Sequence, residues 1–249
     1  LTEAGIVFFL SLAVADKKHI LIYLLCPLII VEVYAGMHID IISAFLLIAA
    51  FYFFKIKKYY PFLIFLTASV LIKYLSLILL PIFLIAYIRS EKTNTDRSGL
   101  ILDLGIKCLI ALSFSFLLFL PYINAGGGLF SQLRNYLVFW RFNGSFFYLT
   151  ETLFGKDAAW WTRILLLSTA LGFLSLHKRI EVQDKIVAAI MVFFLLAPTV
   201  YPWYLIPIVP FFAFRLRKSE FFFVSIVFLS YYVLIDYKST GVWKENPII

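Results

Sequence analysis

Ten apolar runs follow one another along the chain, and they constrain its fold more than any other feature. They cover residues 4–15, 20–36, 41–54, 59–72, 74–88, 100–121, 160–176, 185–200, 203–214 and 220–236. A membrane-spanning helix needs about 20 residues, with about 17 as a usual minimum. Several runs are shorter, and tilted or broken helices would accommodate them. We therefore expect an all-α transmembrane bundle of about ten spans, which forms a single domain over residues 1–249.

The composition supports a membrane protein. Of the 249 residues, 63% are apolar and 14% are charged, whereas soluble domains have about 45–50% and about 25%. This balance excludes a soluble enzyme, a disordered chain and a secreted disulfide scaffold. Cys26 and Cys108 both lie in apolar stretches, which indicates packed thiols rather than a disulfide or a metal pair. The chain begins with Leu1 inside an apolar segment, so we expect an N-terminal part of the protein to precede it.

The basic residues predict an orientation. The formal net charge of +8 is scattered between the apolar runs, so it does not indicate a nucleic-acid partner. Instead, every second connection is basic, and this side of the bundle carries Lys17, Lys18, Lys55, Lys57, Lys58, Arg89, Lys92, Arg97, Lys178, Arg179, Lys185, Arg215, Arg217 and Lys218. The opposite side carries half as many: Lys73, Arg134, Arg141, Lys156, Arg163, Lys238 and Lys244. The first side is therefore predicted to be cytoplasmic, because basic residues favour inner loops.

The outer side is predicted to carry a long loop at residues 122–159. The loop begins with a flexible turn at residues 124–128, which includes Gly126 and Gly127. An amphipathic helix in the membrane interface is predicted by the helical spacing of Leu133, Tyr136, Leu137 and Trp140. All five tryptophans fall on this side, namely Trp140, Trp160, Trp161, Trp203 and Trp243. Either such rings pack on a sugar or a lipid, together with Tyr201, or they anchor the loop at the surface.

Two carboxylates and a histidine lie at the outer end of the second and third runs. These residues are Glu32, His38 and Asp40. A carboxylate within a span costs about 2.5–3.5 kcal/mol, so residues of this kind usually face a polar cavity. Alternatively, Glu32 and Asp40 reach headgroup water or pair with Lys73. A third interpretation makes His38 and Asp40 ligands of a divalent metal, since their side chains suit one.

Lys73 stands alone between two apolar runs at the same side. A lone lysine there suits a phosphate group as a point charge. It could equally extend to the membrane interface. Arg134 and Arg141 in the long loop raise the same question, and they are either substrate-binding groups or solvated charges.

These pieces, in this order, resemble the membrane glycosyltransferases of the C superfamily, whose mannosyltransferase-like members use polyprenyl-phosphate sugars. The resemblance covers most of the chain and is carried by Pro27-Leu28-Ile29 with Glu32, Gly36-Met37-His38-Ile39-Asp40, Ile72-Lys73, Leu79-Leu80-Pro81, Phe142-Asn143-Gly144-Ser145 and Pro202-Trp203-Tyr204-Leu205 before Pro210. Cys26 stands where the family often has an asparagine before the proline. The resemblance implies inverting transfer of a hexose such as mannose from a polyprenyl-phosphate donor to a glycan or lipid-linked acceptor. This would occur at the outer face, in a prokaryotic plasma membrane, as part of making a cell-envelope glycan.

The same resemblance implies roles for individual residues. Catalytic work is expected of Asp40, Glu32 and His38, and substrate binding of Lys73, Arg134, Arg141, Asn143, Tyr201 and Trp203. A general base takes the acceptor proton, and basic groups neutralise the leaving lipid phosphate. The key aspartate of the family lies in a first outer loop, expected before Leu1, so Asp40 could instead orient donor, acceptor or a metal.

Two other functional classes remain open from the sequence. A transporter or flippase for a lipid-linked or small polar substrate would place polar groups near the bilayer midplane. A polysaccharide polymerase or ligase would share the long outer loop and the lipid-phosphate donor. The polar residues gather at one face of this chain, which favours surface chemistry over transport.

Overall fold

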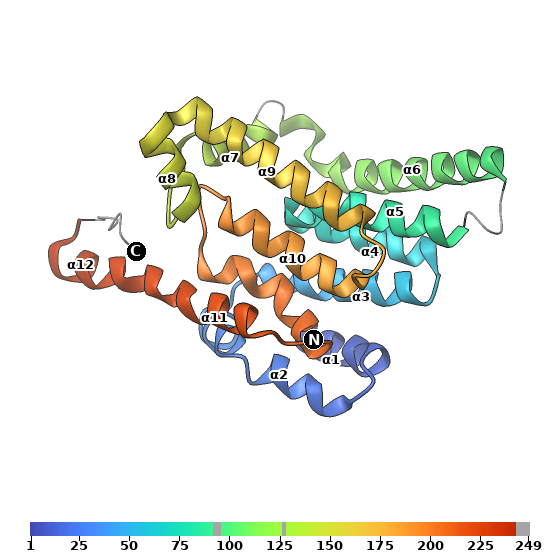
Figure 1. The fold of residues 1–249 in the computed structure, drawn as a ribbon, viewed down its shortest axis with the longest axis horizontal. Helices are drawn as coiled ribbons and strands as arrows, with labels where there is room; N and C mark the ends of the chain where they lie inside the picture. Colours follow the sequence, from blue (N-terminus) through green and yellow to red (C-terminus); the bar gives the residue numbers. More distant parts are fainter. Residues whose placement is uncertain (92–95, 126–127, 243–249) are drawn as a thin grey trace.

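The computed structural model describes residues 1–91, 96–125 and 128–242, which fold almost entirely into helices (Figure 1). Within these residues there is no β-strand, and Phe142 and Thr199 form an isolated bridge. The predicted all-α fold is thus confirmed. Several residues of the sequence analysis lie outside the described backbone, namely Lys92, Gly126, Gly127, Trp243 and Lys244. The side chain of Leu137 is not described either.

Twelve α-helices and six shorter or tighter helices are found in the described part of the chain. The α-helices are α1 (Thr2–Ala13), α2 (Ile20–Leu24), α3 (Asp40–Lys55), α4 (Tyr59–Ile72), α5 (Leu80–Glu91), α6 (Arg97–Phe119), α7 (Gly128–Phe139), α8 (Ser145–Phe154), α9 (Lys156–Leu176), α10 (Val182–Leu195), α11 (Lys218–Ile226) and α12 (Tyr232–Thr240). The 3-10 helices are η1 (Lys17–His19), η3 (Tyr74–Leu79), η4 (Leu120–Ala125), η5 (Pro202–Ala213) and η6 (Val227–Tyr231), and η2 (Ile29–Ala35) is a π-helix.

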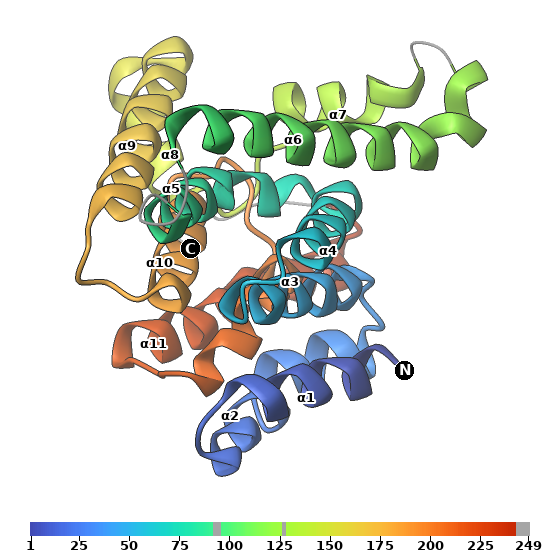
Figure 2. The ribbon, with the colours of Figure 1, turned by 90° about the vertical axis from the view of Figure 1, so that its right-hand side faces the viewer.

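The core is built around α3 and η5, which pack against each other. Residues 205–213 of η5 are all buried. Pro207 and Pro210 lack a backbone N–H, so they cannot support α-helical hydrogen bonds, and the segment winds as a 3-10 helix instead. On α3, the small side chains of Ala44, Ala49 and Ala50 are buried. They let neighbouring helices approach closely, and α4 and α1 flank α3 (Figure 2).

Within the described residues, four helical segments are long and apolar enough to cross a membrane. They are Tyr74–Glu91, Arg97–Ala125, Lys156–Leu176 and Lys218–Thr240. A fifth span results if Lys17–Leu24 and Ile29–Ala35 are counted together, although they are bent by 66°. These segments support membrane insertion of the chain.

The structure therefore supports four or five spans rather than the predicted ten or so. The reason is helix length. Other apolar runs form helices of 12 to 16 residues, such as α1, α3 and α4. At 1.5 Å per residue these are roughly 18–24 Å long, which is less than the ~30 Å hydrocarbon core. Apolarity alone could not distinguish short core helices from spans.

The predicted long loop at residues 122–159 is largely helical where it is described. It contains α7, where the amphipathic helix was expected, and α8, which packs on α9 (Figure 1). A helix at residues 128–139 is confirmed. Its place at a membrane interface and on the outer side stays a prediction.

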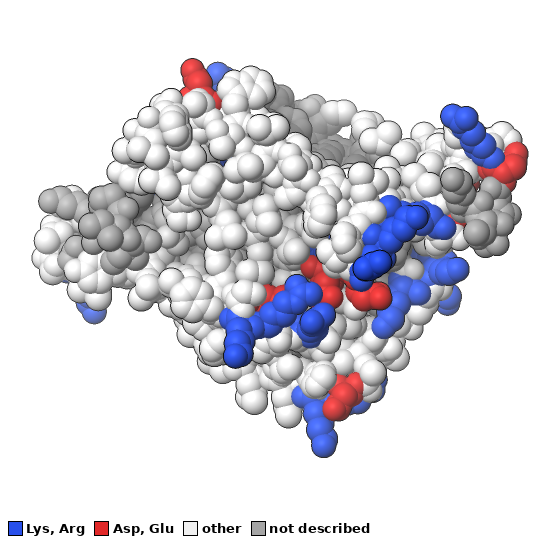
Figure 3. Space-filling view, in the orientation of Figure 1, with Lys and Arg blue, Asp and Glu red and all other residues white. Residues whose placement is uncertain are grey.

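Charged side chains are unevenly distributed over the face seen in Figure 3. Lys and Arg gather over its lower right part, and the left part is almost uncharged (Figure 3). Arg215 and Arg217 both form ion pairs with Asp184, at N–O distances of 3.7 and 3.0 Å. The distribution agrees with basic connections at one end of the bundle, whereas the assignment of that end to the cytoplasm stays a prediction.

Candidate functional site

Asp40 and Lys73 form an ion pair between α3 and the break that follows α4. Asp40 is the first residue of α3, where a carboxylate suits the positive end of the helix dipole. α4 ends at Ile72, and Lys73 has an extended backbone (φ −150°, ψ 118°) before η3 begins. The ammonium group of Lys73 also lies 3.9 Å from the ring centroid of Tyr204. Both charges are thus partnered in a largely buried place, since Asp40 is only 8% exposed.

Three buried serines fix the helices that carry this ion pair. The hydroxyl oxygens of Ser43 and Ser69 are 3.1 Å apart, and those of Ser69 and Ser76 are 2.7 Å apart. These contacts join α3, α4 and η3. They fix the ends of the helices that carry Asp40 and Lys73 relative to each other.

Glu32 and His38 form a second polar group. Glu32 is only 1% exposed. Its Oε2 lies 3.3 Å from His38 Nε2, and its Oε1 accepts a hydrogen bond of 2.8 Å from Tyr231. Gly36 allows the chain to turn here, because a Cβ atom would lie 2.9 Å from the Glu32 carbonyl oxygen. Pairing with Lys73 was one alternative for both Glu32 and Asp40, and in the structure it is Asp40 that pairs with Lys73.

A ladder of stacked rings leads away from His38. His38 stacks on Trp203 with 4.3 Å between ring centroids, and Trp203 stacks on Tyr201 at 4.5 Å. Tyr201 stacks in turn on Phe142 at 4.4 Å. Both faces of Trp203 and of Tyr201 are therefore covered. Neither ring offers a free face to a sugar in this arrangement, and the substrate-binding role of Tyr201 and Trp203 stays a prediction.

The segment around Asn143 is hydrogen-bonded to the residues that precede η5. The Phe142 N–H donates to the Pro198 carbonyl at 3.1 Å, and the Val200 N–H donates to the Phe142 carbonyl at 2.8 Å. The Asn143 side chain points to the Val200 carbonyl at 3.5 Å. A Cβ atom on Gly144 would lie 2.7 Å from the Pro198 carbonyl oxygen, so only glycine fits there. Asn143 thus holds the ladder in place rather than lining a cavity.

A cavity of about 820 Å³ opens beside the Lys73 ammonium group. Its polar lining includes Lys73, Arg163 and Thr199, and much of the rest is apolar or aromatic: Leu75, Leu77, Leu133, Tyr136, Trp140, Phe193, Phe194 and Tyr204. Leu133, Tyr136 and Trp140 belong to the predicted amphipathic face, which therefore faces this cavity. Trp140 is 50% exposed, so its indole ring is accessible to a ligand. Glu32, His38 and Asp40 are not among the described residues that line this cavity.

Neither predicted arginine of the long loop lines the cavity. Arg134 is exposed. Arg141 lies 3.7 Å from Glu151 in an ion pair and packs over the rings of Phe147 and Trp160. Both side chains are directed elsewhere because the cavity wall is formed by the apolar face of α7.

Arg163, rather than Arg134 or Arg141, is the arginine that lines the cavity. It lies on α9, and its guanidinium is 5.1 Å from the ring centroids of Trp160 and of Phe193. Its Nε is buried and has no hydrogen-bond partner among the residues that the structure describes. The sequence signal was present, because Arg163 stands alone in an apolar run. Ionisable residues within spans usually mark functional sites.

The described residues provide no set of ligands for the metal ion that was considered at His38 and Asp40. No group of three or more His, Cys, Asp or Glu side chains within them is arranged to hold a metal ion. His38 is directed to Glu32, and Asp40 is directed to Lys73. The two residues thus belong to separate pairs.

Comparison of the chain with protein-family models, with curated proteins and with solved structures found no match.

Proposed function

We propose that this protein transfers a hexose from a polyprenyl-phosphate donor to a hydroxyl of a glycan or lipid-linked acceptor. The observation that carries the proposal is the cavity of about 820 Å³ with two basic groups in an otherwise largely apolar wall. The reaction would take place at the outer face of a prokaryotic plasma membrane.

A polyprenyl-phosphate sugar matches the chemistry of this wall. Its lipid chain is apolar and would lie against Leu77, Leu133 and Phe193. Its phosphate carries a negative charge that Lys73 and Arg163 would neutralise from two sides. The buried Nε of Arg163 has no partner within the described residues, so an anion would satisfy a donor that is otherwise unpaired. The exposed indole of Trp140 would contact the sugar.

The ion pair suggests how donor binding would prepare the base. An arriving phosphate competes with Asp40 for Lys73, and this frees the Asp40 carboxylate. Asp40 then accepts the proton of the acceptor hydroxyl while that oxygen bonds to the anomeric carbon. The bond from this carbon to the phosphate oxygen breaks, and its electron pair stays on the phosphate, beside Lys73 and Arg163. Attack opposite the leaving group inverts the anomeric centre.

Glu32 and His38 would support this reaction at a distance. Glu32 accepts from Tyr231 and faces His38, which stacks on Trp203. Trp203 is adjacent in sequence to Tyr204, and the Tyr204 ring lies under the Lys73 ammonium. These residues would therefore position Lys73 and Tyr204.

The test is transfer of a radiolabelled hexose by the purified protein in lipid nanodiscs. Polyprenyl-phosphate hexose is supplied in one reaction and nucleotide-activated hexose in another, with a lipid-linked glycan as acceptor. We expect product only from the lipid-phosphate donor. Product only from the nucleotide donor would overturn the proposal.

A second measurement distinguishes the proposed transferase from the alternative, a transporter or flippase. The protein is reconstituted in vesicles that contain a fluorescent polyprenyl-phosphate sugar, and an impermeant quencher is added outside. Rapid loss of signal from both leaflets, without any sugar transfer, would identify a flippase and contradict the transferase.

A further inference from the structure

A second cavity, which shares no lining residue with the Lys73 cavity, lies at the ends of three helices. It has a volume of about 460 Å³ and lies between the turn that joins α3 to α4, the end of α5 and the first part of α6. Its lining residues are Lys57, Lys58, Tyr59, Tyr60, Pro61, Tyr87, Glu91, Leu100, Asp103 and Lys107. The candidate spans Tyr74–Glu91 and Arg97–Ala125 meet at this place. The ends of spans lie at the depth of lipid headgroups.

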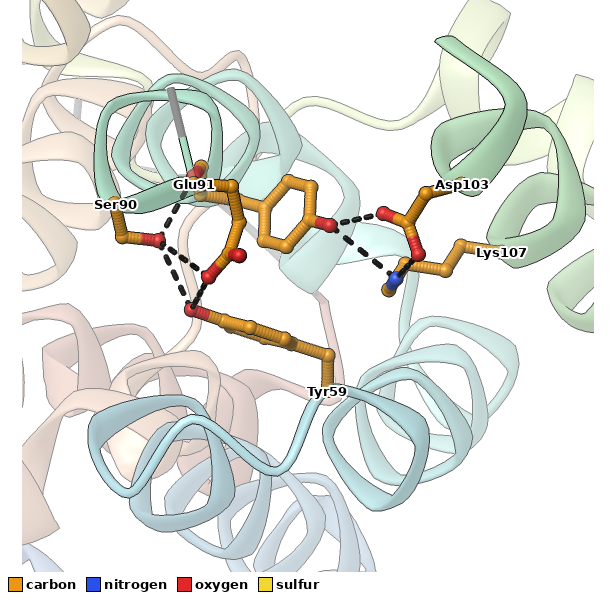
Figure 4. Close-up of polar contacts among 6 residues, drawn as sticks. Tyr59, Ser90, Glu91, Asp103 and Lys107 are labelled. Carbon is orange, nitrogen blue, oxygen red and sulfur yellow. Dashed lines mark hydrogen bonds and ion pairs between the residues drawn. The ribbon is translucent and has the colours of Figure 1, made fainter. Parts of the chain in front are cut away.

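Lys107 is held at the inner wall of this cavity by a polar network (Figure 4). It is the only buried residue of α6, a helix that is described throughout. Its ammonium group forms an ion pair with Asp103 and donates to the Tyr87 hydroxyl at 3.2 Å. It lies 5.1 to 5.8 Å from the ring centroids of Tyr87, Tyr60 and Tyr59. Two of the three N–H groups of the ammonium are used in these bonds, and three tyrosine rings surround it.

The carboxylates of the cavity are already engaged by donors of the protein. Asp103 accepts from Lys107 and from the Tyr87 hydroxyl. Glu91 accepts from the Tyr59 hydroxyl at 3.2 Å, and Ser90 lies 2.9 Å from the same hydroxyl (Figure 4). Asp103 is therefore neutralised by Lys107, whereas Glu91 is bonded only to neutral hydroxyls and keeps its negative charge.

The lysines at the cavity mouth, unlike Lys107, have no carboxylate partner within the described residues. Lys57 and Lys58 are exposed, and neither forms an ion pair within the described part of the chain. Lys57 has a φ of 59°, a left-handed conformation that glycine adopts at lower cost. A lysine at this position places a second ammonium beside Lys58 at the end of α3.

We propose that this cavity binds the anionic phosphate of a lipid headgroup. The side chains of Lys57, Lys58 and Lys107 all line this one space, and the first two have no ion-pair partner within the described residues. Leu100 lines the cavity, and the apolar side chains of Ile101 and Leu102 on α6 are 62% and 67% exposed. These side chains offer a path for acyl chains that leave the headgroup along α6. Basic pockets between membrane helices bind anionic headgroups in this way.

Native mass spectrometry of the purified protein in an uncharged detergent tests the proposal. The probes are phosphatidic acid, phosphatidylcholine of the same chain length and inorganic phosphate. We expect phosphatidic acid to remain bound and phosphatidylcholine to be lost. The double variant Lys57→Gln/Lys58→Gln should weaken phosphatidic acid binding by roughly tenfold or more, because each lysine near a charged headgroup contributes to its attraction.

The matched control is the double variant Lys178→Gln/Arg179→Gln. These two adjacent cations are also exposed, but they lie between α9 and α10 and do not line the cavity. We expect binding as strong as in the unmodified protein. Equal weakening in both double variants, or none in Lys57→Gln/Lys58→Gln, would overturn the proposal. Displacement of phosphatidic acid by inorganic phosphate at equal concentration would also overturn it, since the site would then take free phosphate rather than a lipid.

Discussion

Lys73 reaches back across the end of α4 to form an ion pair with Asp40, the first residue of α3. Neither residue is left as an isolated charge, and the Tyr204 ring covers the ammonium at 3.9 Å. The pair joins the only predicted site residue that lines the large cavity, Lys73, to the strongest candidate for a general base, Asp40. Predictions about this pair therefore test the proposed reaction directly.

Replacing Asp40 by asparagine keeps the shape of the side chain and removes its negative charge. We expect sugar transfer to fall by roughly 10²-fold or more, because the acceptor proton loses its base. The Michaelis constant for the donor should fall, because the phosphate no longer competes with Asp40 for Lys73. The control is Asp157→Asn on α9, which removes an exposed carboxylate. Transfer at the unmodified rate by Asp40→Asn would show that this carboxylate does not take the proton.

The stability of the protein should depend on the pair as a unit. Lys73→Met leaves Asp40 largely buried without a cation, so we expect the free energy of unfolding to fall by about 3–5 kcal/mol. The double variant Asp40→Asn/Lys73→Met removes both charges and should recover most of this loss. It should nevertheless transfer no sugar. Denaturant unfolding followed by tryptophan fluorescence measures the first effect, and a double variant as unstable as Lys73→Met would contradict the pairing.

Gly144 should be required for the contact between residues 142–144 and 198–200. A Cβ atom would meet the Pro198 carbonyl oxygen at 2.7 Å, which the backbone must move to avoid. Gly144→Ala should therefore lower the free energy of unfolding by about 1–3 kcal/mol. Gly172→Ala is the control, since nothing lies within 4 Å of its Cβ position in α9. The control should be neutral or slightly stabilising, because alanine favours helix. Thermal unfolding of both variants measures the difference.

The sequence predicted the helical class and the neighbourhood of the polar residues, but it left the Asp40–Lys73 ion pair as one of several alternatives. Apolar runs and lone charges are local properties, so Lys73 and Asp40 could be recognised as unusual where they stand. Which partner each one meets depends on how α4 ends and on how α3 packs. The same reason explains why Glu32, for which pairing with Lys73 was one alternative, instead faces His38 and Tyr231. Tyr231 is 199 residues away from Glu32, and no local pattern connects them.

The stacked rings illustrate a second limit of sequence reasoning. A cluster of aromatic residues indicates either a sugar platform or a structural anchor, because composition is the same in both. Tyr201 and Trp203 prove to be covered on both faces by Phe142, by each other and by His38. Trp140, in contrast, keeps half of its surface exposed beside the cavity. Only the three-dimensional arrangement separates the two roles.

The orientation of the bundle is tested by cysteine labelling in intact cells. Cys108 is exposed and is first replaced by serine. Single cysteines at Lys57 and Arg217 should be shielded from an impermeant thiol reagent, because basic connections favour the cytoplasm. A cysteine at Asn124, an exposed position of η4, should react. Permeabilised cells provide the control, since all three positions should then be labelled. Labelling of Lys57→Cys from outside would show that the orientation is the reverse of the predicted one.

Arg163 should be the second cation for the donor phosphate. Arg163→Gln keeps a polar side chain against Trp160 and Phe193 but removes the charge that faces the cavity. We expect the Michaelis constant for polyprenyl-phosphate hexose to rise by roughly tenfold, because a charge-assisted hydrogen bond contributes about 1.5–3 kcal/mol. Arg134→Gln is the matched control, since Arg134 is exposed on α7 and does not line the cavity. Added salt should weaken donor binding less in Arg163→Gln than in the unmodified protein, because the variant has one cation fewer for salt to screen. If Arg134→Gln raises the Michaelis constant and Arg163→Gln does not, the donor phosphate binds outside this cavity.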